Sequence, residues 1–212
     1  MGAKCVYDIS TEGKSPAMVE REIIRRIEAH TGRRLTSWQV TVSFHTNPDK
    51  KRPTIEIVSL PDIKDRVFLI SPPLVTEAQP TLVPLLRRIS NYSPKYNRSA
   101  RGLQFDFVDF LVRVGMSFDR HGGATGVVVQ IEYRPCSYTA DCERLIAELM
   151  ERIAAPLVPP PQANHDPGIS AAATTSYNYT RVDVDATKFN DKDLMPFSHR
   201  TEALLFAKLL RA

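Results

Sequence analysis

The chain has 212 residues and a formal net charge of +4 at neutral pH, with 42% hydrophobic and 25% charged residues. These values are ordinary for a globular protein, and a chain of this length can bury about 70% of its unfolded surface. We therefore expect one large domain, or one domain with appendages. Three cysteines are too few for a disulfide framework, which indicates a reducing, intracellular compartment. The sequence shows neither the roughly 18 consecutive apolar residues of a membrane span nor a signal-peptide apolar region.

Two helices are predicted in the N-terminal half. The first begins at Ser15-Pro16, where serine can cap the first turn and proline lacks only an N–H that a helix start does not need. It ends before Gly32. The second helix covers 81–89, and we expect its apolar side chains to face the core: Leu82, Leu85, Leu86 and Ile89.

Strands are predicted around these helices by alternation of apolar and polar residues. From Trp38 to Phe44 every second residue is apolar, which is typical of a strand with one buried face. Shorter strands are expected over 3–9, 54–60 and 66–70, with the sheet segment ending at 71–73 and a loop following over 90–101.

The middle of the chain carries the strongest pattern. LQFDFVDFLVRVG (103–115) and GVVVQIEYRPC (126–136) read as two strands, and the glycine-rich segment between them predicts an antiparallel hairpin. A helix begins near Asp141 and buries Leu145, Ile146, Leu149, Met150 and Ile153. Several connections are too short for parallel crossovers. The sequence therefore favours an α+β fold: an antiparallel β-barrel, two-layered and meander-like, flanked by helices.

Three segments are predicted along the chain. Residues 1–155 form the β-barrel core with helices, and 156–175 form a flexible linker because this stretch is rich in proline and alanine. Residues 176–212 supply an edge strand near Val182 and a C-terminal helix, roughly Ser198 to Leu210, that packs back on the core.

The sequence predicts no catalytic residue, metal or cofactor. Cys136 and Cys142 are spaced too widely for a zinc knuckle, and His121-Gly122-Gly123 matches no phosphate-binding loop. Barrel hydrolases hold a divalent metal with paired Glu-x-Glu carboxylates, but Gln130-Ile131-Glu132 is one carboxylate short. Because one of the two carboxylates is present, a metal-dependent, triphosphatase-like β-tunnel enzyme is kept as the alternative function. A basic nucleic-acid-binding module is a third possibility, although we interpret basic clusters such as Lys50-Lys51-Arg52 as solvated surface.

The positive signal is for binding to another protein. The central hairpin carries apolar residues on both faces, so its second face is covered either by a helix of the same chain or by a partner. Both explanations stay open at this point. The residues predicted for a partner interface are Phe105, Phe107, Asp109, Leu111, Arg113 and Val128.

Several motifs resemble the Mediator complex subunit 20 family. They are the opening MGAKC, DFLVRVG (109–115), GVVVQIEYRPC (126–136) and Asp141-Cys142 before an apolar helix; the chain from Pro156 onward departs from the family. The resemblance implies a β-barrel with helices and a non-catalytic, nuclear subunit of the Mediator head module. It also implies a heterodimer with subunit 18, contacts with subunit 8 and other head subunits, and an indirect link to RNA polymerase II. Neither membrane association nor sequence-specific nucleic-acid binding is expected.

Overall fold

The computed structural model describes residues 2–30, 32–156, 176–184 and 197–211. Its helices are α1 (Pro16–Ala29), α2 (Leu82–Ser90), α3 (Thr139–Ala154) and α4 (His199–Arg211). Its strands are β1 (Ala3–Ile9), β2 (Arg33–Thr46), β3 (Ile55–Ser59), β4 (Val67–Ser71), β5 (Leu74–Ala78), β6 (Ser93–Phe107), β7 (Phe110–Phe118), β8 (Ala124–Tyr133) and β9 (Tyr179–Arg181). None of these helices is long and apolar enough to cross a membrane.

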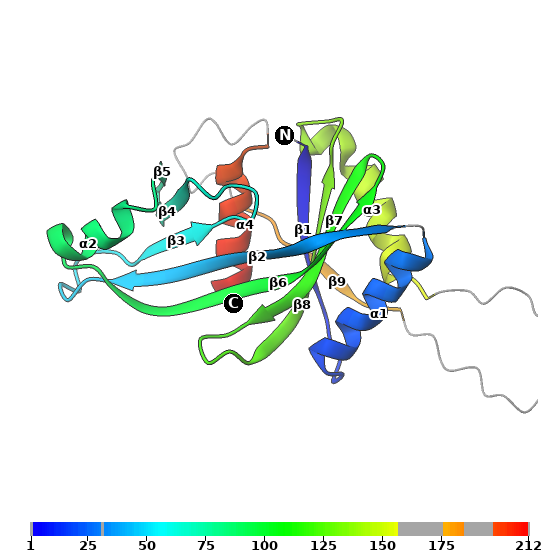
Figure 1. Ribbon diagram of the computed structural model, residues 1–212, viewed down its shortest axis with the longest axis horizontal. Coiled ribbons are helices and arrows are strands. Elements are labelled where there is room, and N and C mark those ends of the chain that lie inside the picture. The colour runs from blue at the N-terminus through cyan, green and yellow to red at the C-terminus, as the bar shows by residue number, and fades with distance from the viewer. Residues whose placement is uncertain (1, 31, 157–175, 185–196, 212) are drawn as a thin grey trace, which may run out of the picture.

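The strands form one antiparallel sheet in the order β5-β4-β3-β2-β6-β7-β8-β1-β9. This confirms the predicted antiparallel α+β fold. The sheet is not closed, because among the described residues β5 and β9 are its two edges and do not pair with each other. The barrel expected from the sequence is therefore an open, strongly curved sheet with helices on both faces (Figure 1).

Two hydrophobic cores lie on opposite faces of the sheet. Alternation separates them: in β1, Cys5 and Tyr7 belong to the core under α1 and α3, whereas Val6 belongs to the core under α4. We call these the outer core and the inner core, respectively. In Figure 1 the long strands β2 and β6 cross the molecule, with α1 and α3 at one end and α2 at the other. The second face of the central strands is thus covered in part by α4 of the same chain.

The first helix forms for the reasons that its sequence indicates. The Ser15 hydroxyl accepts the Met18 N–H at 3.3 Å, and Pro16 occupies the first helical position. The helix buries Val19, Ile23 and Ile27 in the outer core, and Glu22 pairs with Arg26 at 3.0 Å.

The prediction of one strand over 103–115 is wrong, because the chain turns between β6 and β7. Val108 has a φ of 61° and is 86% exposed, and Phe107 pairs with Phe110 across this turn. A β-branched residue rarely adopts such a backbone conformation, so the alternation pattern gave no sign of the turn. Arg134 holds the turn: its backbone N–H donates to the Asp109 carbonyl at 2.9 Å.

Further corrections concern the segments around α2 and α3. The predicted loop over 90–101 is mostly the start of β6, and 71–73 is not an end of the sheet but a turn leading into β5. In α3, Leu145 is 43% exposed, although its neighbour Ile146 is fully buried as expected.

The C-terminal segments pack on the body of the protein. β9 pairs with β1, and α4 buries Leu204 and Phe206 in the inner core. The predicted linker lies almost wholly outside the described residues. The boundaries of the three predicted segments stay a prediction.

Candidate functional site

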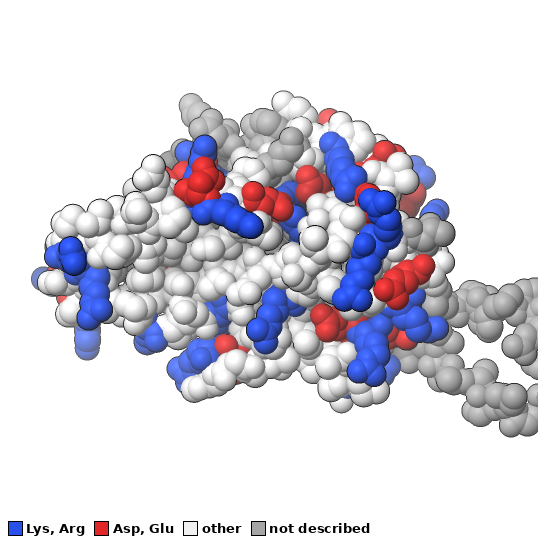
Figure 2. All heavy atoms as spheres, viewed as in Figure 1, with Lys and Arg blue, Asp and Glu red and all other residues white. Residues whose placement is uncertain are grey.

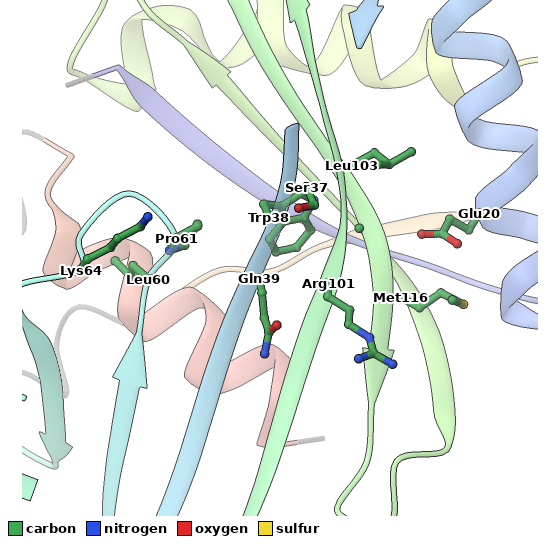
Figure 3. Close-up of a pocket in the computed structure, with 11 residues that line it drawn as sticks. Glu20, Ser37, Trp38, Gln39, Leu60, Pro61, Lys64, Arg101, Leu103 and Met116 are labelled. Carbon is green, nitrogen blue, oxygen red and sulfur yellow. The ribbon is translucent and has the colours of Figure 1, made fainter. Parts of the chain in front are cut away.

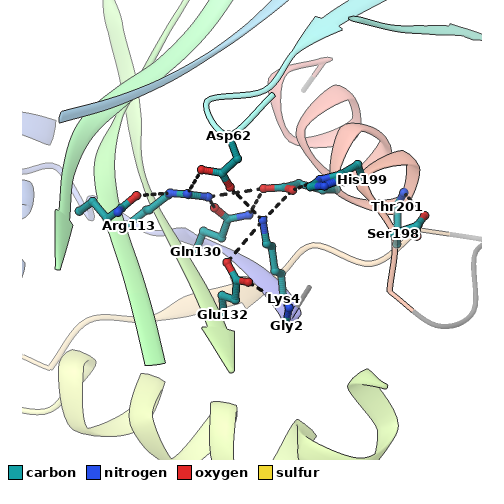
Figure 4. Close-up of polar contacts among 11 residues, drawn as sticks. Gly2, Lys4, Asp62, Arg113, Gln130, Glu132, Ser198, His199 and Thr201 are labelled. Carbon is teal, nitrogen blue, oxygen red and sulfur yellow. Dashed lines mark hydrogen bonds and ion pairs between the residues drawn. The ribbon is translucent and has the colours of Figure 1, made fainter. Parts of the chain in front are cut away.

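A cluster of charged and amide side chains lies between the sheet and α4, on the inner face. We call this cluster the inner polar network: Lys4, Asp62, Arg113, Gln130, Glu132 and Glu202. Figure 4 shows that it joins β1, β7, β8, the β3–β4 loop and α4. Segments far apart in the sequence therefore meet through charges rather than through apolar packing alone.

Glu202 of α4 is the centre of this network and is fully buried. Its carboxylate accepts hydrogen bonds from Lys4 Nζ at 2.8 Å and Gln130 Nε2 at 2.7 Å. Burial alone would raise the pKa of Glu202, but the Lys4 charge, the contact with His199 at 3.5 Å and the hydrogen bonds from Lys4 and Gln130 lower it to about 2. The side chain is thus a carboxylate at neutral pH, and removing one partner would leave a buried charge unpaired.

The cations of the network are also buried and paired. Burial lowers the pKa of Lys4, but Glu202 and Glu132 outweigh it, so the pKa of the ammonium is raised. Arg113 donates from Nη2 to Asp62 at 2.5 Å and from Nη1 to the Gln130 amide oxygen at 2.8 Å. Burial alone would raise the pKa of Asp62, but Arg113 brings it below its usual value. The network is internally satisfied.

This arrangement offers little for catalysis. Glu132, the carboxylate of the incomplete Glu-x-Glu pair, lies 3.5 Å from Lys4 Nζ and accepts the Gly2 N–H at 3.1 Å. Within the described residues, no group of three or more His, Cys, Asp or Glu side chains is placed to hold a metal ion. The network acts as a polar clamp that fixes α4 to β1, β7 and β8.

Sequence reasoning missed Lys4 and Glu202. The signal was present: Lys4 stands among the apolar residues at the start of a strand, and Glu202 directly precedes the apolar run ALLFA. A charged residue in a buried pattern indicates a buried partner of opposite charge. The sequence does not reveal which partner, because the two residues are separated by almost the whole chain.

The cysteines fit the structural interpretation. Cys5 and Cys142 are buried, and burial together with the nearby Cys136 raises the pKa of Cys142 to about 11. The thiol is therefore protonated and unreactive at neutral pH. Cys136 and Cys142 both donate to the Tyr138 carbonyl, at 3.2 and 3.3 Å.

The six residues predicted for a partner interface do not share one surface. Phe105 and Val128 are fully buried on opposite faces of the sheet, and Arg113 is part of the inner polar network. Phe107 is half-buried against the outer core. Only the remaining two approach solvent near the β6–β7 turn, since Asp109 is exposed and Leu111 is half-buried.

The β6–β7 turn therefore carries the accessible part of the predicted set. We call Phe107, Val108, Asp109 and Leu111 the hairpin end. Val108, which the sequence reasoning did not select, is the most exposed large hydrophobic residue among those described. Leu111 lies opposite Asp106 on β6 and Glu132 on β8. That these residues contact a partner stays a prediction.

A separate surface hollow of about 710 Å³ lies over the middle of β2 and β6 (Figure 3). Trp38 lines it, and the indole N–H donates to the Val114 carbonyl at 3.2 Å. Arg101, Lys64 and Glu20 also line it, but Figure 3 shows them spread around the rim rather than converging on one point.

The matching family model and the relatives found by sequence agree on one family. A family model described as the TATA-binding related factor (TRF) of subunit 20 of Mediator complex matches residues 1–184. Subunit 20 of Xenopus laevis is 26% identical over 190 residues, covering 82% of this chain and 90% of that protein. Subunit 20b of Arabidopsis thaliana is 24% identical over 145 residues, covering 64% of this chain and 66% of that protein. The family match includes the nine strands of the described residues and leaves α4 outside.

Solved structures of enzymes are also weakly similar to this chain, and one of them shows the extent of the similarity. It is a putative adenylyl cyclase from Hippeastrum, described as having a dominant triphosphatase activity. The likeness covers 74% of this chain and 89% of that chain, with 9% identity and a TM-score of 0.43. A likeness of this size carries no argument about function.

Proposed function

The chain belongs to the family of subunit 20 of the Mediator complex, and from this premise we propose that it is a non-catalytic scaffold of the Mediator head module. In this role it supports RNA polymerase II transcription through contacts with other Mediator subunits. The observation that carries the proposal is the family match over residues 1–184, which includes the whole sheet. The nucleus is the compartment that this role requires.

The inner face of the sheet supports a scaffold rather than an enzyme. An enzyme that used this curved sheet as a reaction chamber would need an open interior with free acidic side chains. Here α4 covers part of the inner face, and Glu132 and Glu202 are both paired with Lys4. These pairings favour a role in which the fold presents surfaces to other proteins.

The hairpin end is the surface that we propose for the heterodimer with subunit 18, with subunit 8 and other head subunits as further partners. Val108 is 86% exposed in a left-handed conformation, and Leu111 is a half-buried leucine that belongs to neither core. A strained backbone conformation costs free energy in an isolated chain, and residues held in such conformations cluster at functional and ligand-binding sites.

Co-purification of tagged full-length chain from its own cells tests this proposal, with the other Mediator subunits measured by mass spectrometry. In Leu111→Lys the new charge lies between Asp106 and Glu132, so the hairpin tolerates it. We expect at least tenfold less subunit 18 with this variant. Val108→Asn, which suits the left-handed backbone, should reduce recovery while the chain stays folded.

The matched control is Leu145→Lys, the same substitution at an exposed leucine of α3. It should leave the recovery of subunit 18 unchanged. Full recovery with folded Leu111→Lys and Val108→Asn would exclude the hairpin end. Absence of every Mediator subunit from the wild-type sample would refute the scaffold role.

The enzyme alternative has its own test. We expect the purified chain to release no phosphate from a nucleoside triphosphate in the presence of Mg²⁺ or Mn²⁺. Metal-dependent turnover that is lost in Glu132→Ala would establish the alternative, because Glu132 is the carboxylate that such a site would use.

A further inference from the structure

The helix α2 has an apolar face that the described chain leaves uncovered. The sequence predicted Leu85 and Ile89 in the core, but Leu85 is 42% and Ile89 is 79% exposed. None of the residues of α2 is buried. The two side chains are one helical turn apart and therefore form a continuous apolar stripe.

This helix is held in place despite its exposure. The Tyr92 hydroxyl donates to the Pro53 carbonyl at 3.0 Å, and the Asn47 amide donates to the Ser90 carbonyl at 2.5 Å. Both bonds join the C-terminal end of α2 to the β2–β3 turn. The apolar stripe is therefore a fixed part of the surface.

The surroundings of α2 are basic. Between Glu77 and Asp106 the sequence has no acidic residue, and Arg87, Arg88 and Lys95 in this stretch are exposed. The β2–β3 turn adds the exposed run Lys50–Arg52, next to one exposed acidic residue, Asp49. Figure 2 shows Lys and Arg side chains at the end of the molecule where Figure 1 places α2 and the β2–β3 turn.

A groove lies beside the helix and combines both properties. It has a volume of about 600 Å³ and is lined by His45, Val83, Pro84, Arg87, Arg88, Tyr92 and Pro94. Tyr92 is 6% and His45 is 5% exposed, so the bottom of the groove is formed by side chains that are packed into the protein. Its apolar lining can receive a hydrophobic side chain, and the two guanidinium groups can pair with carboxylates.

We propose that one surface of α2 binds an acidic segment of a partner protein that also carries apolar side chains. This α2 face runs from the stripe of Leu85 and Ile89 across Arg88 to the adjoining groove, which Arg88 and Arg87 line. The segment crosses the helix: its apolar side chains cover Leu85 and Ile89, and its carboxylates pair with Arg88 next to the stripe and with Arg87 in the groove. The α2 face lies on the part of the sheet away from the hairpin end (Figure 1). The proposal is therefore independent of the interface proposed for subunit 18.

The features of the surface favour a protein partner over a nucleic acid. Binding of single-stranded nucleic acid uses open aromatic rings on which bases stack. Here the Tyr92 ring is buried, and Tyr96 is half-buried and stacks on Phe44 with ring centroids 4.5 Å apart. An exposed aliphatic stripe flanked by arginine matches an amphipathic acidic helix or strand.

Binding of a labelled synthetic peptide to the full-length chain, followed by fluorescence anisotropy, tests the proposal. The peptide has about 15 residues, enough for four helical turns, with leucine and phenylalanine spaced among aspartate and glutamate. We expect saturable binding that weakens as salt is raised. Two comparison peptides, one with lysine in place of every acid and one with serine in place of every apolar residue, should bind at least tenfold more weakly.

Two double variants identify the site. Arg87→Glu with Arg88→Glu removes the positive charges that pair with the carboxylates of the peptide. Leu85→Ser with Ile89→Ser removes the apolar stripe. Each should weaken binding about tenfold, because each removes one of the two contributions. The matched control is Arg144→Glu with Leu145→Ser, which changes a neighbouring exposed arginine and leucine on α3. This control should bind the peptide like the wild type.

The outcomes are distinct. Unchanged peptide binding in both folded α2 variants would overturn the proposal, and so would absence of binding to the wild-type chain. Tighter binding of a single-stranded oligonucleotide, with no competition from the acidic peptide, would show that the patch serves a nucleic acid instead. Both α2 variants should still co-purify with subunit 18, so failure here is distinguishable from failure of the proposed scaffold role.

Discussion

The helices α4 and α2 are both amphipathic, yet they have opposite environments. α4 buries most of its side chains against the sheet, including Ala203, Phe206 and Leu210. α2 buries none. An apolar stripe in a sequence therefore predicts that one face of the helix is covered. It does not show whether the covering residues belong to the same chain or to a partner.

The difference lies in what each helix meets. α4 lies against the inner face of the sheet, where Lys4 and Arg113 receive Glu202. α2 is attached at its C-terminal end to the β2–β3 turn and has basic side chains around it. α4 completes the fold through an internal ion pair. α2 instead leaves its apolar stripe and its positive charges exposed to solvent. Stability should depend on the first, and binding on the second.

The largest expected effect is on stability, from Glu202→Ala. The substitution leaves Lys4 buried without its nearest carboxylate and should cost about 3–5 kcal/mol of unfolding free energy. Urea unfolding followed by circular dichroism measures the loss. The control is Glu148→Ala, which breaks the exposed Arg144–Glu148 pair and should cost less than about 1 kcal/mol. An equal loss of unfolding free energy in the two variants would show that the buried Lys4–Glu202 pair stabilises the fold no more than the exposed Arg144–Glu148 pair does.

The same contrast explains how far the sequence could predict the structure. Periodicity and capping correctly predicted β1, α1, the second half of β2, α3 and the antiparallel sheet, because each depends on residues close in sequence. The turn at Val108 was missed because its residues look like strand, and the exposure of Ile89 was missed because its pattern looks like core.

The candidate site was harder to predict for a related reason. The pairing of Lys4 with Glu202 joins the first strand to the last helix, and no local pattern encodes a contact at that separation. Phe105 and Val128 were correctly recognised as apolar strand residues, but the sequence does not show which face meets α4 and which meets α1.

An effect of intermediate size is expected from acid. The pKa of Glu202 is about 2 in the folded chain and 4.5 for the ordinary side chain. Between these values the unfolded state binds more protons, so stability from this group is present above about pH 4.5 and is lost as the pH falls toward 2. The loss amounts to about 2–3 kcal/mol. Unfolding measured from pH 5 to pH 2 should show a shallower decline in Glu202→Gln than in wild type. Identical slopes of unfolding free energy against pH in the two proteins would show that groups other than Glu202 cause the acid sensitivity.

The smallest expected effect is from Ile89→Ser in α2. Isoleucine and serine have similar helix propensities, and a side chain that is 79% exposed loses little burial when it is shortened. The unfolding free energy should therefore change by no more than about 0.5 kcal/mol. The equivalent substitution in α4, Leu204→Ser, removes a side chain that is 4% exposed and should cost about 3 kcal/mol.

This near-neutrality is the informative part of the comparison. If Ile89→Ser leaves stability intact and weakens binding of the acidic peptide, the apolar stripe of α2 is maintained for binding rather than for folding. A loss of stability in Ile89→Ser close to that of Leu204→Ser would mean instead that α2 packs inside the folded chain. The stripe would then be unavailable to a partner, and the docking surface would lose its physical basis. Urea unfolding of the two variants, measured side by side with the wild type, decides between these outcomes because the same serine is introduced in both helices.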